Sequence, residues 1–276
     1  MRRIILMLVL LAASVPAICA GHTLVVSGNR IVLDRHKVEL LYRSSGDLDG
    51  DGKAETVFSI EQWSAMDFPK AVFVVARAQR GKWHVIASDE YGECDLRADV
   101  TDVNGDHRAE IVARSTSGDG HGIAEILALR RGKLVTLGGF GLTRLRDLNG
   151  DGIPEVLSLE WTVFGFVGDH WLTIHKWNGE GYTDVSARFP KQYGPVIKDL
   201  RREIYLLRYT HYHGSRSDPS HDPELFSGMY YYLGLAYEYH REPAKAKMQY
   251  AIAYRLKPDD EDVQRAFRRT WHIKPK

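Results

Sequence analysis

Three nine-residue segments of this chain have almost the same sequence, and this repeat limits the possible folds more than any other feature. They read DLDGDGKAE, DVNGDHRAE and DLNGDGIPE, span residues 47–55, 102–110 and 147–155, and are named here the first, second and third loops. Positions 1, 3, 5 and 9 of each loop carry a side-chain carboxylate or amide oxygen. An ion of the size of calcium binds about 6–8 oxygens, and short polar side chains at alternate positions of a tight turn can provide them. The repeat therefore predicts three calcium-binding loops.

The predicted ligands follow from these positions. Position 7 is expected to add its backbone carbonyl oxygen, so that its side chain can point into solvent. The predicted calcium ligands are Asp47, Asp49, Asp51, Lys53 and Glu55 in the first loop, Asp102, Asn104, Asp106, Arg108 and Glu110 in the second, and Asp147, Asn149, Asp151, Ile153 and Glu155 in the third.

The loops differ from EF-hands, which require a bidentate Glu at position 12 and a helix on each side. Position 12 is Phe58, Ala113 or Ser158, and β-forming residues follow each ninth-position Glu. We therefore expect each ion to close a turn that leads into a strand. The alternative is that Asp-Gly and Asn-Gly only mark hairpin turns. The acid at position 9 of all three copies favours the ion.

The loops begin 55 and then 45 residues apart, a spacing typical of propeller blades and related arrays. Each loop is followed by two β-like runs, a Gly-bearing turn and a third β-like run. In these features residues 40–185 resemble the FG-GAP/VCBS family, whose repeats carry the same acidic loop at a blade turn. The resemblance implies a mainly β fold of propeller-like blades, calcium at the acidic positions, and a binding or scaffolding role. Because propellers close with about 4–8 blades and three loops are visible, we expect a partial or open array.

The second loop departs from the family pattern at position 6, where His107 replaces Gly. This position is expected to need a positive φ, which His adopts less readily than Gly. We therefore expect the second loop to bind calcium most weakly.

The N-terminus has the pattern of a secretory signal, with Arg2 and Arg3, an apolar run and a cleavage site after Ala20. We therefore expect an exported protein, secreted or periplasmic, with no transmembrane span. Acylation at Cys19 is the alternative, but Ile18 is bulky for it. Removing residues 1–20 lowers Lys plus Arg from 37 to 35 against 36 acids, so the formal charge changes from +1 to −1 and gives no attraction to nucleic acid. The mature chain would keep only Cys94 and have no internal disulfide.

After the β domain, predicted for residues 21–185, the pattern becomes helical. A linker (186–222) would contain a helix over residues 195–209 and a polar loop, and residues 259–270 would form a capping helix with Asp259 as N-cap. The segment 223–276 resembles a tetratricopeptide (TPR) repeat. With Ser227 as position 1, TPR positions 4, 7, 8, 11, 20, 24, 27 and 32 are Tyr230, Leu233, Gly234, Tyr237, Ala246, Tyr250, Ala253 and Pro258. Small residues at Gly234 and Ala246 would let two helices meet, and the unit would dock on the β domain or on another protein.

Other chemistry has little support in the sequence. No Gly-x-Ser-x-Gly, P-loop or His-Glu-x-x-His motif occurs, and we predict no catalytic or organic-cofactor residues. A cluster of His211, His213 and His221 could hold a transition metal or only lie in a polar loop. A strand face with Trp171, Thr173, His175 and Trp177 could stack on sugars or pack between blades. The sequence therefore predicts an exported, calcium-binding, non-catalytic scaffold that binds another protein. A glycan-binding module and a hydrolase with structural calcium are the alternatives.

Overall fold

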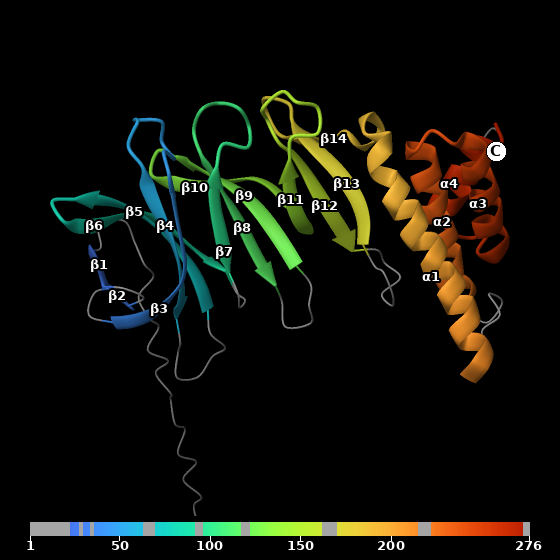
Figure 1. Ribbon diagram of the computed structural model, residues 1–276, viewed down its shortest axis with the longest axis horizontal. Helices are drawn as coiled ribbons and strands as arrows, with labels where there is room; N and C mark the ends of the chain where they lie inside the picture. The colour runs from blue at the N-terminus through green and yellow to red at the C-terminus, as the bar shows by residue number, and fades with distance from the viewer. Residues whose placement is uncertain are drawn as a thin grey trace, which may run out of the picture.

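The computed structural model describes residues 23–27, 30–33, 36–62, 70–91, 96–116, 122–161, 170–214 and 222–272. It is mainly β up to residue 184 and helical afterwards, so the predicted mainly β fold is confirmed (Figure 1). The strands are β1 (Thr23–Ser27), β2 (Arg30–Leu33), β3 (His36–Gly46), β4 (Glu55–Gln62), β5 (Lys70–Gln79), β6 (Lys82–Tyr91), β7 (Arg97–Thr101), β8 (Glu110–Thr116), β9 (Gly122–Arg130), β10 (Lys133–Phe140), β11 (Leu142–Arg146), β12 (Glu155–Trp161), β13 (His170–Trp177) and β14 (Tyr182–Asp184). The helical segments are η1 (Ser186–Arg188), η2 (Pro190–Gln192), α1 (Tyr193–Gly214), α2 (Pro223–Tyr239), α3 (Pro243–Leu256) and α4 (Glu261–Thr270).

The strands form three antiparallel sheets that follow one another along the molecule (Figure 1). The first contains β1 to β6 in sequence order, and β1 also pairs with β6. The second contains β7 to β10 and the third β11 to β14, again with sequence neighbours paired. The three acidic loops join β3 to β4, β7 to β8 and β11 to β12, the equivalent connection in each sheet. They consequently lie along one edge of the array, the upper edge in Figure 1.

Alternation of side chains along the strands buries both faces of the second sheet. In β8, Ile111 belongs to the core that includes Leu48 and Phe73 of the first sheet unit. Its neighbour Val112 belongs to a different core, which includes Val156 of the third sheet. A strand buried on both faces needs apolar residues at successive positions. This requirement explains the near-continuous apolar runs that follow each loop.

The described helices cover the outer face of the third sheet and share its core. Trp171 on β13 is 9% exposed. Its ring centroid lies 5.7 Å from that of Tyr193 at the start of α1, and 5.4 Å and 6.0 Å from those of Tyr232 and Tyr239 in α2. Of the two docking partners expected for the helical unit, the structure thus shows the β domain.

Two details of the helical region differ from the sequence predictions. Helix α1 extends to Gly214, into the expected polar loop, because no Gly or Pro interrupts residues 196–213. The N-cap of α4 is Asp260 rather than Asp259, since Asp260 Oδ1 accepts hydrogen bonds from two backbone N–H groups of the first turn, both at 3.0 Å. At Gly234 the close approach of α2 and α3 agrees with the prediction: a β-carbon there would lie 2.6 Å from Tyr250 Cε1 in α3.

Several predictions fall on parts of the chain that the structure does not describe. These are the signal peptide (1–20) with Cys19, and Cys94. No helix in the described ranges combines the length and the apolar character that crossing a membrane requires.

Candidate metal centres

Backbone amides hold the oxygens of all three loops in the same way. The first-position Asp accepts from the N–H of position 4 through Oδ1, at 2.7 Å in every loop. Its Oδ2 accepts from the N–H of position 6 at 2.8, 3.0 and 2.9 Å. The oxygens of positions 3 and 5 accept from the N–H groups of positions 5 and 7. One local structure is therefore built three times, as the repeated sequence predicts.

Positions 4 and 6 of each loop have positive φ. Position 4 is Gly in all three loops, with φ of 80°, 79° and 81°. At position 6, Gly52 and Gly152 have φ of 80° and 84°, and His107 has φ of 67°. The expectation that His107 must adopt a positive φ is confirmed.

The ninth-position Glu is buried in every loop, with exposed fractions of 0%, 2% and 0% for Glu55, Glu110 and Glu155. Its Oε2 accepts from the backbone N–H of position 2, at 2.9, 3.1 and 2.7 Å. The other carboxylate oxygen, Oε1, has a different partner in each loop. The three loops differ at this atom.

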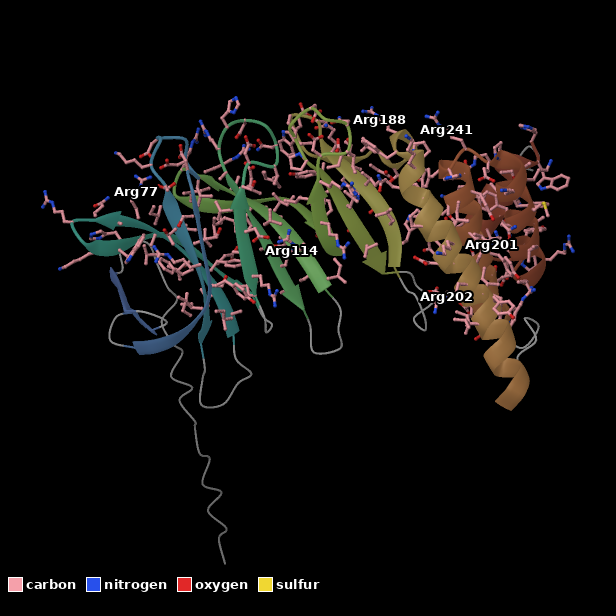
Figure 2. All side chains as sticks on the ribbon, viewed as in Figure 1. Arg77, Arg114, Arg188, Arg201, Arg202 and Arg241 are labelled. Carbon is pink, nitrogen blue, oxygen red and sulfur yellow. The ribbon has the colours of Figure 1, made fainter. Side chains whose placement is uncertain are left out.

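In the first loop the partner of Oε1 is Arg77, which extends from β5 toward the loop (Figure 2). Arg77 Nε donates to Glu55 Oε1 at 2.8 Å, and Nη2 donates to the same oxygen and to Asp49 Oδ2, the latter at 2.8 Å. Nη1 lies 3.2 Å from Asp51 Oδ2. The hydrogen bond to Glu55 raises the pKa of Arg77 although burial opposes this. A permanently charged guanidinium thus joins positions 3, 5 and 9.

In the third loop the partner is Lys176 on β13. Its Nζ lies 2.8 Å from Glu155 Oε1 and 2.5 Å from Asp151 Oδ2. Burial acts to lower the pKa of Lys176, but the hydrogen bonds to Asp151 and Glu155 raise it overall. The hydrogen bond from Lys176 in turn lowers the pKa of Asp151. An ammonium group thus joins positions 5 and 9.

The register of the sheets shows that Arg77, Ala128 and Lys176 occupy equivalent positions. In each sheet, the residue that follows the Glu of the loop pairs with the residue that precedes Arg77, Ala128 or Lys176. Each of these three residues therefore stands opposite the Glu of its loop. The pairs that follow the Glu are Thr56–Ala76 in the first sheet, Ile111–Leu127 in the second and Val156–His175 in the third. The second sheet therefore has a methyl group where the other two have a cation.

Glu110 of the second loop accordingly has a different environment. Its Oε1 accepts from Asn104 Nδ2 at 2.7 Å, an uncharged donor within the same loop. No basic side chain in the described ranges forms an ion pair with Glu110. Burial raises its pKa to about 7, and the charges of Asp106 and Asp102 add to this rise, while the hydrogen bond from Val103 N–H and the charge of Arg130 oppose it. A cation bound in this loop would favour the ionised carboxylate.

A calcium ion in the second loop would compete with fewer side-chain cations than an ion in the other two loops. Asp47, Asp49 and Glu55 of the first loop bring one oxygen each within 4.8 Å of one another. Carboxylates repel at such distances unless a cation lies between them, and Arg77 already provides that cation. A metal ion in the first or third loop would have to displace Arg77 or Lys176. In the second loop it would break no ion pair among the described residues, although Arg108, Arg130, Arg131 and Lys133 line the cavity beside the loop.

A cavity of about 880 Å³ opens beside the second loop. Its volume is within the range of about 300–1,000 Å³ that is typical of ligand pockets. The short side chain of Ala128 forms part of its wall, next to Glu110. The lining residues are the apolar Leu48, Ala128, Leu129 and Val135, the acidic Asp49, Asp106 and Glu110, and the basic Arg108, Arg130, Arg131 and Lys133.

A second cavity, of about 560 Å³, lies between α1 and the α2–α3 hairpin. The residues that line it follow the acidic loops in the sequence and belong to the helical region. Its charged lining residues are the basic Lys198, Arg201, Arg202 and Lys245, with Glu242 and the titratable His240. Glu242 already pairs with Lys245 and His240.

The aromatic strand face and the histidine cluster, the other sites suggested by the sequence, have less support in the structure. Trp171 is buried against the helices, and Trp177 packs edge-on against Tyr182 with ring centroids 5.3 Å apart. The strand face expected to stack on sugars or to pack is therefore mostly used for packing. The backbone of His211 and His213 belongs to the end of α1, whereas their side chains, and all of His221, lie outside the described residues.

Sequence reasoning missed Arg77 and Lys176. A signal for Arg77 exists: it ends the apolar run 71–76, and the corresponding position of the second unit is the apolar Ala128 within residues 126–129. The charge of Arg77 indicates a partner for the ninth-position Glu only when the strand register is known, because the register places the two residues opposite each other.

A scan of the chain against models of known protein families finds no match. A search of curated proteins finds no similar sequence either. Function is therefore inferred from the residues and geometry of the loops and the adjoining cavity.

Proposed function

We propose that the protein is an exported, non-catalytic binding protein of the FG-GAP/VCBS type that binds an acidic segment of another protein with the help of calcium. In this proposal the three sheets are propeller-like blades of an open array, the helices form a TPR-like end, and the destination is the periplasm or the extracellular space. The observation that carries the proposal is the cavity beside the second loop.

The charges of this cavity suit an acidic ligand. Four basic side chains, Arg108, Arg130, Arg131 and Lys133, line it together with an apolar wall and three acidic side chains. Of these acids, Asp49 already pairs with Arg77, and Asp106 and Glu110 would hold the ion, which leaves the four basic side chains to the ligand. Arginine binds carboxylates through paired, charge-assisted hydrogen bonds. If each of its four polar side chains contributes one oxygen, the second loop offers these four and one carbonyl oxygen, fewer than the about 6–8 that calcium requires, so a ligand carboxylate could complete the coordination. Calcium and the basic side chains would then act on the same acidic segment.

Glycan binding has less support. Stacking on a sugar needs an exposed aromatic face, and Trp171, the first member of the aromatic strand face, is 9% exposed. No observation among the described residues favours a hydrolase.

Binding of a fluorescent oligoglutamate peptide, measured by anisotropy, tests the proposal. We expect binding in calcium, weaker binding in chelator, and none for an oligoglutamine peptide of the same length. Arg131→Glu should weaken binding because it reverses a charge at the cavity. The control Arg201→Glu makes the same charge change in the second cavity and should leave binding unchanged. Equal binding in calcium and chelator, or a loss with Arg201→Glu alone, would contradict the proposal.

A further inference from the structure

The first and third loops contain a positive charge from the chain itself at the place where an ion would bind. Calcium lies about 2.3–2.6 Å from its oxygen ligands. Lys176 Nζ lies 2.5 Å from Asp151 Oδ2 and 2.8 Å from Glu155 Oε1, nearly the same distances. Arg77 Nη2 lies 2.8 Å from Asp49 Oδ2. An ion bound to these oxygens would therefore compete with the side-chain nitrogens for the same ligand atoms.

We propose that Arg77 and Lys176 replace the metal ion in the first and third loops, so that these loops are held by the chain's own cations, and that the second loop takes the divalent ion. The resemblance in sequence predicts three equivalent calcium sites. The residue opposite the ninth-position Glu divides them into two closed loops, in which a basic side chain occupies the site, and one open loop, in which Ala128 leaves it free for an ion. The statement about the second loop rests on the proposed function. The statement about the other two loops does not.

Burial supports the replacement. Glu55 and Glu155 are fully buried, and the Arg77 and Lys176 side chains are 22% and 16% exposed. Removing either base would leave a buried carboxylate without its partner, which is strongly unfavourable. An incoming ion must therefore compensate for a broken ion pair before it gains any binding energy. In the second loop no such pair has to be broken.

A basic side chain and a calcium ion differ in charge, so removing the base should change what the loop can bind. A guanidinium or ammonium group carries one positive charge and calcium carries two, so a loop that loses its base gains room and negative charge together. Truncation of Arg77 or Lys176 should therefore convert a closed loop into a calcium site. Conversely, a base at Ala128 should close the second loop, since Ala128 stands at the same register position.

Counting bound calcium per chain tests the proposal. The full mature chain is dialysed against roughly 5 mM calcium, above the dissociation constants of about 10⁻⁴–10⁻³ M of extracellular modules. Bound metal is then measured by elemental analysis. We expect one ion for the wild type, two for Arg77→Ala, two for Lys176→Ala and none for Ala128→Lys. The charge-conserving controls Arg77→Lys and Lys176→Arg should stay at one.

A second set of variants avoids dependence on the base truncations, which can fail to fold. Asp102→Asn should abolish calcium binding, whereas Asp47→Asn and Asp147→Asn should leave the wild-type count unchanged. Three ions in the wild type, or a loss with Asp47→Asn or Asp147→Asn, would overturn the proposal. So would Arg77→Ala and Lys176→Ala variants that fold and gain no ion. A wild type without calcium whose truncated variants each gain one ion would instead refute calcium in the second loop, and with it the proposed function, while the replacement in the other two loops stands.

Discussion

Arg108 in the second loop lies against Gly50 in the first loop, so closely that a β-carbon at Gly50 would be 2.6 Å from Arg108 Nε. Ile153 in the third loop lies against Gly105 in the same way, with Cδ1 2.5 Å from the place of such a β-carbon. The seventh-position side chain of one loop thus covers the fourth-position glycine of the preceding loop. Neighbouring sheets are in contact through their loops as well as through their cores.

Two alanine variants can distinguish the energetic effect of the contact between Ile153 and Gly105 from that of backbone strain. Gly105 and Gly150 have φ of 79° and 81°, so alanine at either position costs about 1–2 kcal/mol. Gly105→Ala also meets Ile153, whereas a β-carbon at Gly150 has no described atom within 4 Å. We expect Gly105→Ala to lose about 1 kcal/mol more than Gly150→Ala in urea unfolding, since crowding costs about 1–3 kcal/mol. Equal losses would mean that Ile153 moves aside without cost.

The ion pair of Arg77 and Glu55 should be worth more than an ordinary surface pair. In chelator, Arg77→Met should destabilise the protein by about 3 kcal/mol, because it leaves the buried Glu55 unpaired. The double variant with Glu55→Gln should recover about 1–2 kcal/mol of this loss. Arg114→Met is the control, since its ion-pair partner Asp99 is largely exposed. It should cost about 1 kcal/mol, including the loss of the hydrogen bond that Arg114 Nε donates to the Thr143 carbonyl oxygen at 3.3 Å. Additive effects in the cycle would contradict the pairing.

Trp171 should hold the helices to the third sheet. Trp171→Ala is expected to cost about 3–5 kcal/mol, as is typical of a truncated buried aromatic residue. Trp177→Ala, at a half-buried position of the same strand face, should cost less. Hydrogen exchange should show faster exchange in α1 and α2 for Trp171→Ala, with the first sheet unchanged. Loss of protection confined to β13 would show that the helices dock without this side chain.

Gly234 should be required for the approach of α2 to α3. Gly234→Ala places its β-carbon against the ring of Tyr250, which is fully buried, and should cost about 1–3 kcal/mol. Gly194→Ala is the control in α1. Its β-carbon would make an ordinary contact, 3.6 Å from His240 Nε2. Because Gly194 precedes Pro195, which disfavours a helical conformation for a residue with a β-carbon, we expect no gain but a smaller loss than for Gly234→Ala. Thermal unfolding compares the two, and a stabilised Gly234→Ala would place the helix contact elsewhere.

The strain at His107 should depend on the shape of the side chain. His107→Val puts a β-branched residue at a φ of 67° and should destabilise the loop by about 1–2 kcal/mol. His107→Asn should be nearly neutral, because Asn tolerates this conformation. Chemical unfolding in chelator measures both without a contribution from metal. A neutral His107→Val variant would show that the loop can adopt another backbone conformation.

The sequence predicts those structural features that depend on residues close together in the chain. The acidic loops, the strands that follow them and the positive φ of His107 all follow from short-range rules of turn chemistry and side-chain alternation. The partners of the ninth-position Glu do not. Arg77 lies 22 residues from Glu55 and meets it through strand register, which one bulge can shift. The comparison of Arg77, Ala128 and Lys176 therefore requires the paired strands.

The helical region shows a similar limit. The helices themselves follow from apolar spacing and from Asp-Pro and Glu-Pro starts, and the structure places α2 and α3 at these prolines. The N-cap of α4 could not be chosen between two adjacent aspartates. The docking of α1 on Trp171 also has no local signal, because a buried and an exposed tryptophan look alike in a sequence.

The covering of each loop by the next gives the array a direction. Ala109 N–H also donates to the Asp47 carbonyl oxygen at 2.8 Å, whereas Pro154, at the same position of the third loop, has no N–H to donate. No atom of the described residues covers Gly150, and the helices follow the third sheet along the chain. A further unit inserted between β14 and η1 would have to take the place of the helices on the outer face of the third sheet, where Trp171 and Ile174 share their core. The helical region therefore acts as the cap that ends the row of sheets.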